Sequence, residues 1–240
     1  MKKQIKEFKI FLEEKEEVPK DELRDYYLVP SKAIVFSNPE ILNTIYEDQT
    51  LLMMVVKKIV KENSHPIRTS NLEMLAWEMI EKMNIEHLNY QDREGNSIIH
   101  LTCQMESFSV GILDLMRSCG ANFSLINKKG ETPLMLVSTS SSLDDLKFIH
   151  AYTEKNLINY KDQSGMTALM KAVRSKKINN IFFLLENGAD IFVQDNTGVS
   201  VVDWLNSREF HKKSNPKFWA EIDILLNKII KRKINFPSGS

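Results

Sequence analysis

Short apolar segments with helical spacing recur along most of the chain, and polar segments that contain glycine separate them. Hydrophobic residues in the apolar segments lie three or four positions apart, which is typical of helices that bury one face. The clearest of these segments are 110–116, 143–149 and 181–185. A shorter apolar run precedes each of them, with Leu101, Leu134, Leu136 and Leu169 as its apolar contacts. The pattern predicts an all-α fold built from pairs of short helices.

A glycine recurs at nearly constant spacing between these helix pairs. The positions are Gly95, Gly130, Gly165 and Gly198, in steps of 35, 35 and 33 residues. An Asp or Asn lies three residues before each glycine, and a Ser or Thr lies two residues after it. A fixed period of about 20 to 50 residues indicates a stack of similar units, each of which buries its apolar face against the next one.

Each residue type in this pattern has a local physical role. The Asx side chain accepts backbone hydrogen bonds in a turn, and the glycine adopts a positive φ that a side chain would penalise. The following Ser or Thr is a helix N-cap, as at Thr132, and Pro133 suits a first helical turn that has no use for its N–H. Gly120 and Gly188 are expected to end the second helix of their units.

The four segments 92–102, 127–137, 162–172 and 195–205 superpose on this pattern and resemble the ankyrin repeat. That repeat has a period of about 33 residues and the signature Asp-x-x-Gly-x-Thr-Pro-Leu-His-x-Ala. The best match is at residues 132–134, Thr-Pro-Leu. The resemblance implies an all-α ankyrin-repeat solenoid of helix-turn-helix units with short β-hairpin-like turns.

Further units are expected at both ends of the array. A degenerate unit precedes Gly95, with Asp48 at the position of the turn glycine. We expect an N-terminal helical cap or extension over residues 1–47, for which the alternative is a small appended module, a repeat domain over 48–235 and a tail over 236–240. The expected units are 48–94 with an insertion at 61–69, 95–129, 130–164, 165–197 and a capping unit over 198–235.

Local signals refine the two ends. An amphipathic helix is predicted over residues 1–17, with Ile5, Phe8, Phe11 and Leu12 on its apolar face. Ser70 and Glu73 have the spacing of a capping box that starts a helix ending near Met83. At the other end, helices are predicted from 201 to 205 and from 216 to about 233. The second of these carries an apolar stripe made of Trp219, Ile222, Leu225 and Ile229.

Composition narrows the class of protein. The chain has 32 Lys and Arg against 32 Asp and Glu, which disfavours a general nucleic-acid binder. Residues 206–240 hold eight basic and three acidic residues, so this end carries +5 and the preceding 205 residues carry −5. Two cysteines, the absence of an apolar run of about 20 residues and a polar N-terminus favour a cytoplasmic protein without a transmembrane segment. We expect a monomer in the cytoplasm of the producing cell, or of a host cell if the protein is secreted.

Little in the sequence points to catalysis. His100 and Cys103 lie on one helical face, but the resemblance implies that His100 supports the turn backbone and that Cys103 fills a small buried position. The other histidines lack the spacing of metal ligands, and the common nucleotide-binding and hydrolase motifs are absent. We therefore predict a protein that is not an enzyme and uses neither cofactor nor metal.

The resemblance further implies that the turn tips and the exposed faces of the inner helices form one concave surface that binds a partner protein. The candidate partner-binding residues are Arg93, Glu94, Asn96, Gln104, Met105, Lys128, Lys129, Glu131, Gln163, Ser164, Met166, Arg174, Asn196, Thr197 and Val199, together with Gln91, Thr139, Ser140 and Ser175. Exposed Met166 and Val199 are expected to suit a hydrophobic anchor of the partner.

Two other functions stay open from the sequence. The chain is alternatively the recognition part of a larger enzyme or of a bacterial effector that acts in a host cell, since its Lys-, Ile- and Asn-rich composition is similar to that of ankyrin proteins from host-adapted bacteria. A purely intramolecular spacer is the third interpretation.

Overall fold

The computed structural model describes residues 2–13, 39–61, 66–104, 110–140 and 142–206, and the single residues 220, 222 and 224. The chain divides into two compact units between Thr153 and Glu154. Each unit is described by itself below.

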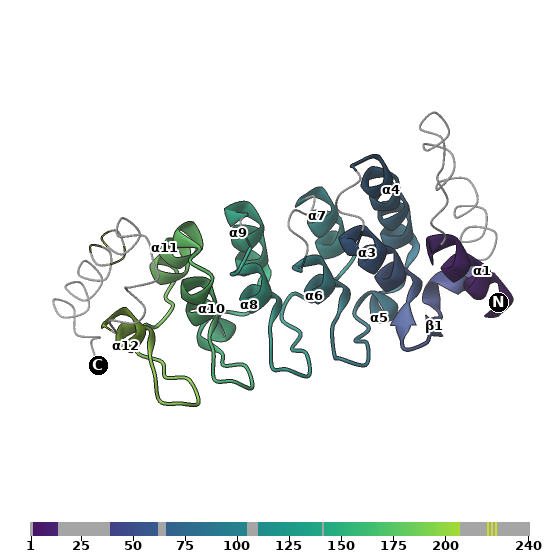
Figure 1. Cartoon of the computed structure of the whole chain (residues 1–240). Helices are drawn as coiled ribbons and strands as arrows, with labels where there is room; N and C mark the ends of the chain where they lie inside the picture. The colour runs from purple at the N-terminus through teal and green to yellow at the C-terminus, as the bar shows by residue number, and fades with distance from the viewer. Residues whose placement is uncertain are drawn as a thin grey trace. The chain divides into compact units, whose positions relative to one another are not determined.

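The first unit is a stack of helix pairs. Its helices are α1 (Lys2–Glu13), η1 (Pro39–Asn43), α3 (Leu51–Lys61), α4 (Pro66–Lys82), α5 (Ile85–Leu88), α6 (Ile98–Thr102), α7 (Val110–Ser118), α8 (Pro133–Val137) and α9 (Leu143–Tyr152). Helices α3, α6 and α8 pack on one another in one row, and α4, α7 and α9 pack in a second row beside it (Figure 1). We call the row of α3, α6 and α8 the inner row and the row of α4, α7 and α9 the outer row. The turns that connect successive pairs project from the side of the inner row (Figure 1). This arrangement confirms the all-α repeat fold that the apolar pattern predicts.

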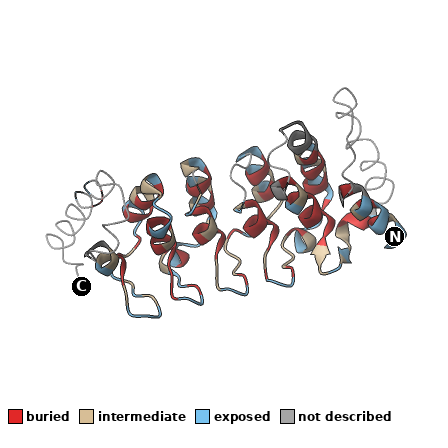
Figure 2. Ribbon diagram, viewed as in Figure 1, coloured by how far each residue is buried: buried red, intermediate tan, exposed pale blue. Residues whose placement is uncertain are grey.

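The core of this unit runs between its two rows of helices. Buried residues line the facing sides of the helices, while residues on the outward sides are exposed (Figure 2). Leu52 and Leu134 in the inner row and Met79, Ile112 and Leu146 in the outer row are fully or almost fully buried. Since each helix has only one apolar face, the stack is stabilised mainly by contacts between neighbouring pairs.

The second unit repeats the same plan. It contains η2 (Lys155–Asn159), α10 (Ala168–Arg174), α11 (Ile178–Glu186) and α12 (Val201–Asn206). Helix α10 packs on α11, η2 and α12, and Leu169, Ile181, Leu184 and Val201 are buried at these contacts. The helices predicted around 181–185 and 201–205 are therefore present.

The chain enters the first unit through α1, which packs on α3. Ile5, Phe8 and Leu12 are buried, as the predicted amphipathic helix requires. The observed helix ends at Glu13, and the rest of the predicted helix to residue 17 lies outside the described residues. The orientation of the Phe11 side chain is also outside them.

Helix α4 begins earlier than the sequence predicts. It starts at Pro66, so Ser70 lies inside the helix and the predicted capping box with Glu73 is wrong. Proline at the first helical position has its φ already set and loses no hydrogen bond there. Helix α3 also continues through Lys61. Both helices thus extend into residues 61–69, where the sequence predicts an insertion.

A two-stranded hairpin precedes α3. Strands β1 (Ile45–Tyr46) and β2 (Gln49–Thr50) are antiparallel and are joined by Glu47 and Asp48. Both joining residues have positive φ, 49° at Glu47 and 62° at Asp48. Positive φ at both central residues is the requirement of the tight turns that suit twisted hairpins, and Asp tolerates it better than most residues. Asp48 therefore takes the conformation of the glycine that it replaces.

The C-terminal prediction is described only in part. Residues 220, 222 and 224 are helical, with Ile222 buried and Ile224 exposed. The remainder of the helix predicted over 216–233, including Trp219, Leu225 and Ile229, lies outside the described residues. The predicted domain and repeat boundaries, from 1–47 to 236–240, stay predictions.

Candidate functional site

The polar turns, which we call fingers, run from the Asx residue to the Ser or Thr cap and comprise residues 92–97, 127–132, 162–167 and 195–200. In the 92–97 finger, Oδ1 of Asp92 accepts hydrogen bonds from the backbone nitrogens of Glu94 at 3.1 Å and Asn96 at 2.9 Å. The nitrogen of Gly95 donates to the Asp92 carbonyl at 2.7 Å, with φ of +76° at the glycine. The other three fingers repeat these bonds, with Asn127, Asp162 and Asp195 at the Asx position. The predicted turn chemistry is confirmed.

Neighbouring fingers of the first unit are bonded to each other. The Lys128 nitrogen donates to the Glu94 carbonyl at 2.9 Å, and Nδ2 of Asn127 donates to Oδ1 of Asn96 at 3.0 Å. Nε2 of Gln91 donates to the carbonyls of Gly95 at 2.6 Å and Ile126 at 2.8 Å. These bonds join the 92–97 and 127–132 fingers into one braced pair.

The two fingers of the second unit are braced in the same way. The Asn196 nitrogen donates to the Ser164 carbonyl at 3.3 Å, and Nδ2 of Asn196 donates to the Gln163 carbonyl at 2.7 Å. Nζ of Lys171 lies 2.9 Å from Oδ2 of Asp162, whose side chain is almost completely buried. This lysine comes from α10, the helix that follows the finger.

The helices after three of the four fingers are capped by the side chain of the predicted residue. Thr132 and Thr167 accept hydrogen bonds from the backbone nitrogens of Met135 and Met170, and Oγ of Ser200 accepts from the Asp203 nitrogen at 3.2 Å. Asp203 also accepts from the Ser200 nitrogen at 2.8 Å, so the two residues cap each other. The bond from the Ser200 hydroxyl lowers the pKa of the Asp203 carboxyl.

His100 supports two elements of the first unit. Its Nδ1 accepts from the Ser97 nitrogen at 3.2 Å, and its Nε2 lies 3.0 Å from the Glu131 carbonyl. One nitrogen accepts and the other donates in the neutral ring, which matches these partners. Burial lowers the pKa of His100, which favours that neutral form. The role that the resemblance implies for His100 is therefore observed.

The candidate partner-binding residues fall into four groups: exposed, partly exposed, buried, which holds Met166 alone, and outside the described residues. Exposed in the structure are Arg93, Glu94, Gln104, Lys128, Lys129, Gln163, Ser164, Arg174, Asn196, Thr197, Thr139 and Ser175. Partly exposed are Asn96, Glu131, Val199, Gln91 and Ser140. Met105 lies outside the described residues.

The expectation that Met166 is exposed is wrong. Its exposed fraction is 7%, and its sulfur lies 3.6 Å from Nη1 of Arg174. The Met166 nitrogen also donates to Oδ1 of Asp162, at the other end of the same finger. Val199 at the equivalent position is partly exposed. Met166 is therefore unavailable as an exposed hydrophobic anchor.

Several candidates also hold the fingers together. The bonds of Gln91 and Asn96 described above join the two fingers of the first unit, and the Glu131 carbonyl faces the His100 ring. Nothing in the local pattern distinguishes these residues from tip residues, because their partners lie 31 or 35 positions away. Only the spacing of the repeats, which places residues about one period apart side by side, signals such bonds.

A hollow of about 440 Å³, open to solvent, lies over the fingers of the first unit. We call it the finger hollow; it is lined by Asp48, Gln91, Asp92, Arg93, Gly95, Ile126, Asn127 and Lys128. Sequence reasoning identified Arg93 and Lys128 as tip residues but did not place the β1–β2 hairpin beside them. The hydroxyl of Tyr90 donates to Oδ1 of Asp48 at 2.7 Å and so helps to hold the hairpin there.

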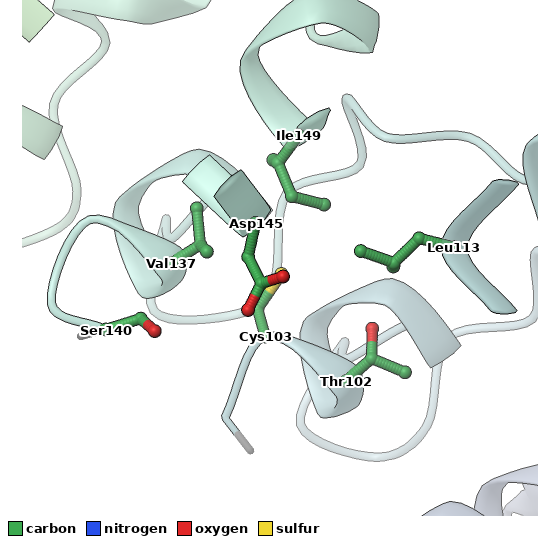
Figure 3. Close-up of a pocket in the computed structure, with 7 residues that line it drawn as sticks. All are labelled: Thr102, Cys103, Leu113, Val137, Ser140, Asp145 and Ile149. Carbon is green, nitrogen blue, oxygen red and sulfur yellow. The ribbon is translucent and has the colours of Figure 1, made fainter. Parts of the chain in front are cut away.

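Cys103 and His100 do not form a reactive pair. Cys103 borders a separate cavity of about 10 Å³, close to the smallest space that holds one water, together with Asp145 and residues of α6 to α9 (Figure 3). Burial raises the pKa of the Cys103 thiol, and the nearby Asp145 carboxyl raises it further. A thiol in such surroundings stays protonated near neutral pH and is a poor nucleophile. Within the described residues, no three His, Cys, Asp or Glu side chains gather as metal ligands would.

Residues 105–195 match the family model of ankyrin repeats, in three copies. The chain contains ankyrin repeats. Ankyrin repeats are generally protein–protein interaction modules, and the family is typically non-catalytic. The 92–97 finger lies outside the matched residues but has the same Asx and glycine bonds, so the geometry of the repeat begins before the match. No helix among the described residues has the length and apolar character of a membrane span.

Proposed function

We infer that this protein is a non-catalytic module that binds a partner protein through its finger tips and the adjoining faces of its inner helices. The observation that carries this proposal is that, in each finger, different residues hold the turn and face the solvent. The Asx side chain and the cap hold the turn and are mostly buried, whereas the residues between them are mostly exposed.

This division leaves the tips rigid but chemically variable. In the first unit the tip side chains are Arg93, Glu94, Lys128 and Lys129, and in the second they are Gln163, Ser164, Asn196 and Thr197. The turn bonds at these tips are mostly made by backbone nitrogens, and the tip side chains are exposed, where a partner can contact them. A loop held in advance loses little conformational entropy on binding, which favours affinity.

A matched pair of charge reversals tests the first unit. Lys129→Glu changes an exposed lysine at a finger tip, and Lys147→Glu makes the same change at an exposed lysine of α9. Helix α9 belongs to the outer row, away from the fingers (Figure 1). Partner proteins are recovered from cell lysate on the immobilised full chain and identified by mass spectrometry, and their affinities for both variants are measured by interferometry. We expect about a tenfold loss with Lys129→Glu and little change with Lys147→Glu.

A second pair tests the other unit without altering an existing charge. Ser164→Arg places a large side chain on the 162–167 finger, and Asn156→Arg places it on the exposed side of η2. Loss of binding with Ser164→Arg alone supports binding by the fingers. Equal affinities for both tip variants and both controls would remove the fingers from the interaction.

A further inference from the structure

We propose that the finger hollow of the first unit binds an acidic segment of a partner protein, with Arg93 as the principal contact for a carboxylate. This inference rests on the proposed function and names the chemistry of the partner at one of its sites. It follows from an inventory of the polar groups that line the hollow, taken group by group.

The two carboxylates of the finger hollow are already engaged. Asp92 accepts from two backbone nitrogens through Oδ1 and lies 3.0 Å from Nζ of Lys57 through Oδ2, and only 3% of its side chain is exposed. Asp48 accepts from the Tyr90 hydroxyl at 2.7 Å. That bond is the main reason that the pKa of Tyr90 is raised. The hydrogen bonds of both acids are therefore directed at the protein itself.

The amide groups of the finger hollow are engaged as well. Both N–H groups of the Gln91 side chain are used by the carbonyls of Gly95 and Ile126. The Asn127 side chain accepts from two backbone nitrogens and donates to Asn96 and Glu131. A ligand therefore finds few N–H donors in the walls of the hollow.

The guanidinium of Arg93 is different. The residue is exposed, and within the described part of the chain the structure gives its side chain no hydrogen bond or ion pair. Lys128, also exposed, adds a second cation to the lining. A planar guanidinium with unused donors binds a carboxylate through two parallel hydrogen bonds, which is the strongest of the common charged pairs.

The balance of charge favours carboxylates over phosphates. The lining holds two cations, Arg93 and Lys128, and two carboxylates, Asp48 and Asp92, and Lys57 pairs with Asp92. A lining without net charge suits a single negative charge placed at Arg93, whereas a phosphate backbone would bring its dense charge close to both acids. The volume of about 440 Å³ is in the range of small ligand sites and accommodates a few side chains of an extended segment.

Selection from a random peptide library displayed on phage tests the chemistry directly. The full chain, its Arg93→Glu variant and its Lys147→Glu variant are the three immobilised targets. We expect peptides rich in Asp and Glu on the wild type and on Lys147→Glu, and loss of that enrichment on Arg93→Glu. Enrichment of basic or uncharged peptides on the wild type would overturn the proposal.

Affinities of one selected acidic peptide then test the geometry. We expect Arg93→Glu to weaken binding at least tenfold and Arg93→Lys to weaken it less, because lysine keeps the charge but loses the paired hydrogen bonds. Circular dichroism spectra of the variants confirm that they are folded. Unchanged affinity in Arg93→Glu, or tighter binding of a single-stranded oligonucleotide than of the peptide at equal salt, would contradict the proposal.

The two proposals fail in different ways. If partners bind through the fingers but the peptides are not acidic, the acidic-segment proposal fails and the interaction module stands. If the finger variants Lys129→Glu and Ser164→Arg leave every partner bound as tightly as their controls do, the proposed function fails.

Discussion

The 162–167 and 195–200 fingers of the second unit have the same turn but different surroundings. Gly165 has a φ of +78° and Gly198 a φ of +80°, so both need a conformation that glycine adopts easily. A Cβ at Gly165 would overlap the backbone nitrogen of Asn196, whereas a Cβ at Gly198 would meet nothing within 4 Å. One glycine is required by its conformation alone and the other also by the close approach of the next finger.

The glycine of the repeat signature therefore meets two separate requirements, one from its own turn and one from the neighbouring finger. The positive φ belongs to the turn and is present at every finger. The close approach arises where another finger stacks on the turn, as it also does at Gly95, where a Cβ would lie 2.7 Å from the Lys128 nitrogen.

The largest expected effect on the free energy of unfolding comes from alanine substitutions that separate these two requirements. Alanine at Gly198 should lower the free energy of unfolding by about 1–2 kcal/mol, the cost of a left-handed conformation for an L-residue. Alanine at Gly165 should lower it by about 3–4 kcal/mol, because the backbones of two fingers must also move apart. Urea denaturation followed by circular dichroism measures both changes. Equal losses in the two variants would show that close approach contributes nothing.

The next effect concerns the ion pair that braces an inner finger. Lys171→Met should lower the free energy of unfolding by about 2 kcal/mol, because the Asp162 carboxylate stays buried with only its backbone donors. In the first unit, Lys57 pairs with Asp92 but 42% of its side chain is exposed. Lys57→Met should therefore cost about 1 kcal/mol. The same denaturation experiment compares them, and a larger loss for Lys57→Met would refute this ranking by burial.

A smaller effect concerns the pH dependence of stability, to which His100 beside the fingers of the first unit contributes. The pKa of His100 is lowered by burial, so the unfolded chain binds more protons than the folded one as the pH falls below the ordinary value of 6.5. Its stabilising contribution is complete above that pH and is lost below it. His100→Gln should show a shallower decline in stability between pH 7 and pH 5 than the wild type, measured as midpoints of urea denaturation. Burial also lowers the pKa of His150, so His150→Gln is measured in parallel to show how much of the decline belongs to that residue. An unchanged slope in His100→Gln would contradict the assignment to His100.

The stability contributed by the 195–200 finger should change at a lower pH. The pKa of Asp195 is lowered, mainly by the bond from the Thr197 hydroxyl, so its contribution is present above the ordinary value of 3.8 and is lost as the pH falls through its folded value. Thr197→Val removes that hydroxyl and should cost about 0.5 kcal/mol at pH 7. The difference between variant and wild type should shrink below pH 3.8. A difference that grows with acid would show that this bond is not its source.

Much of the fold could be predicted because its signals are local. The bonds of Asp92, the positive φ of Gly95 and the cap at Thr132 all close within four residues of the chain. Asp48 could even be placed at a glycine position, because residues 49–56 align with residues 166–173. The start of α4 was misjudged because Ser70 and Glu73 have the spacing of a capping box, while Pro66 starts the same helix one turn earlier.

The candidate site was predicted less completely. The sequence identified the fingers, and Arg93, Lys128 and Lys129 are exposed there. It did not indicate that Met166 turns inward, because that burial depends on the packing around Arg174 and the finger.

The sequence thus determined the local parts of this protein: helices, caps, turns and the period at which they recur. Stacking determined the rest, including the finger hollow, the bond of Gln91 to Ile126 just before the next finger and the close contact at Gly165. The physical reason is the range of the interactions. A turn or a cap is completed by atoms a few residues apart, whereas a brace or a hollow needs residues about one repeat apart that only the packed helices bring together.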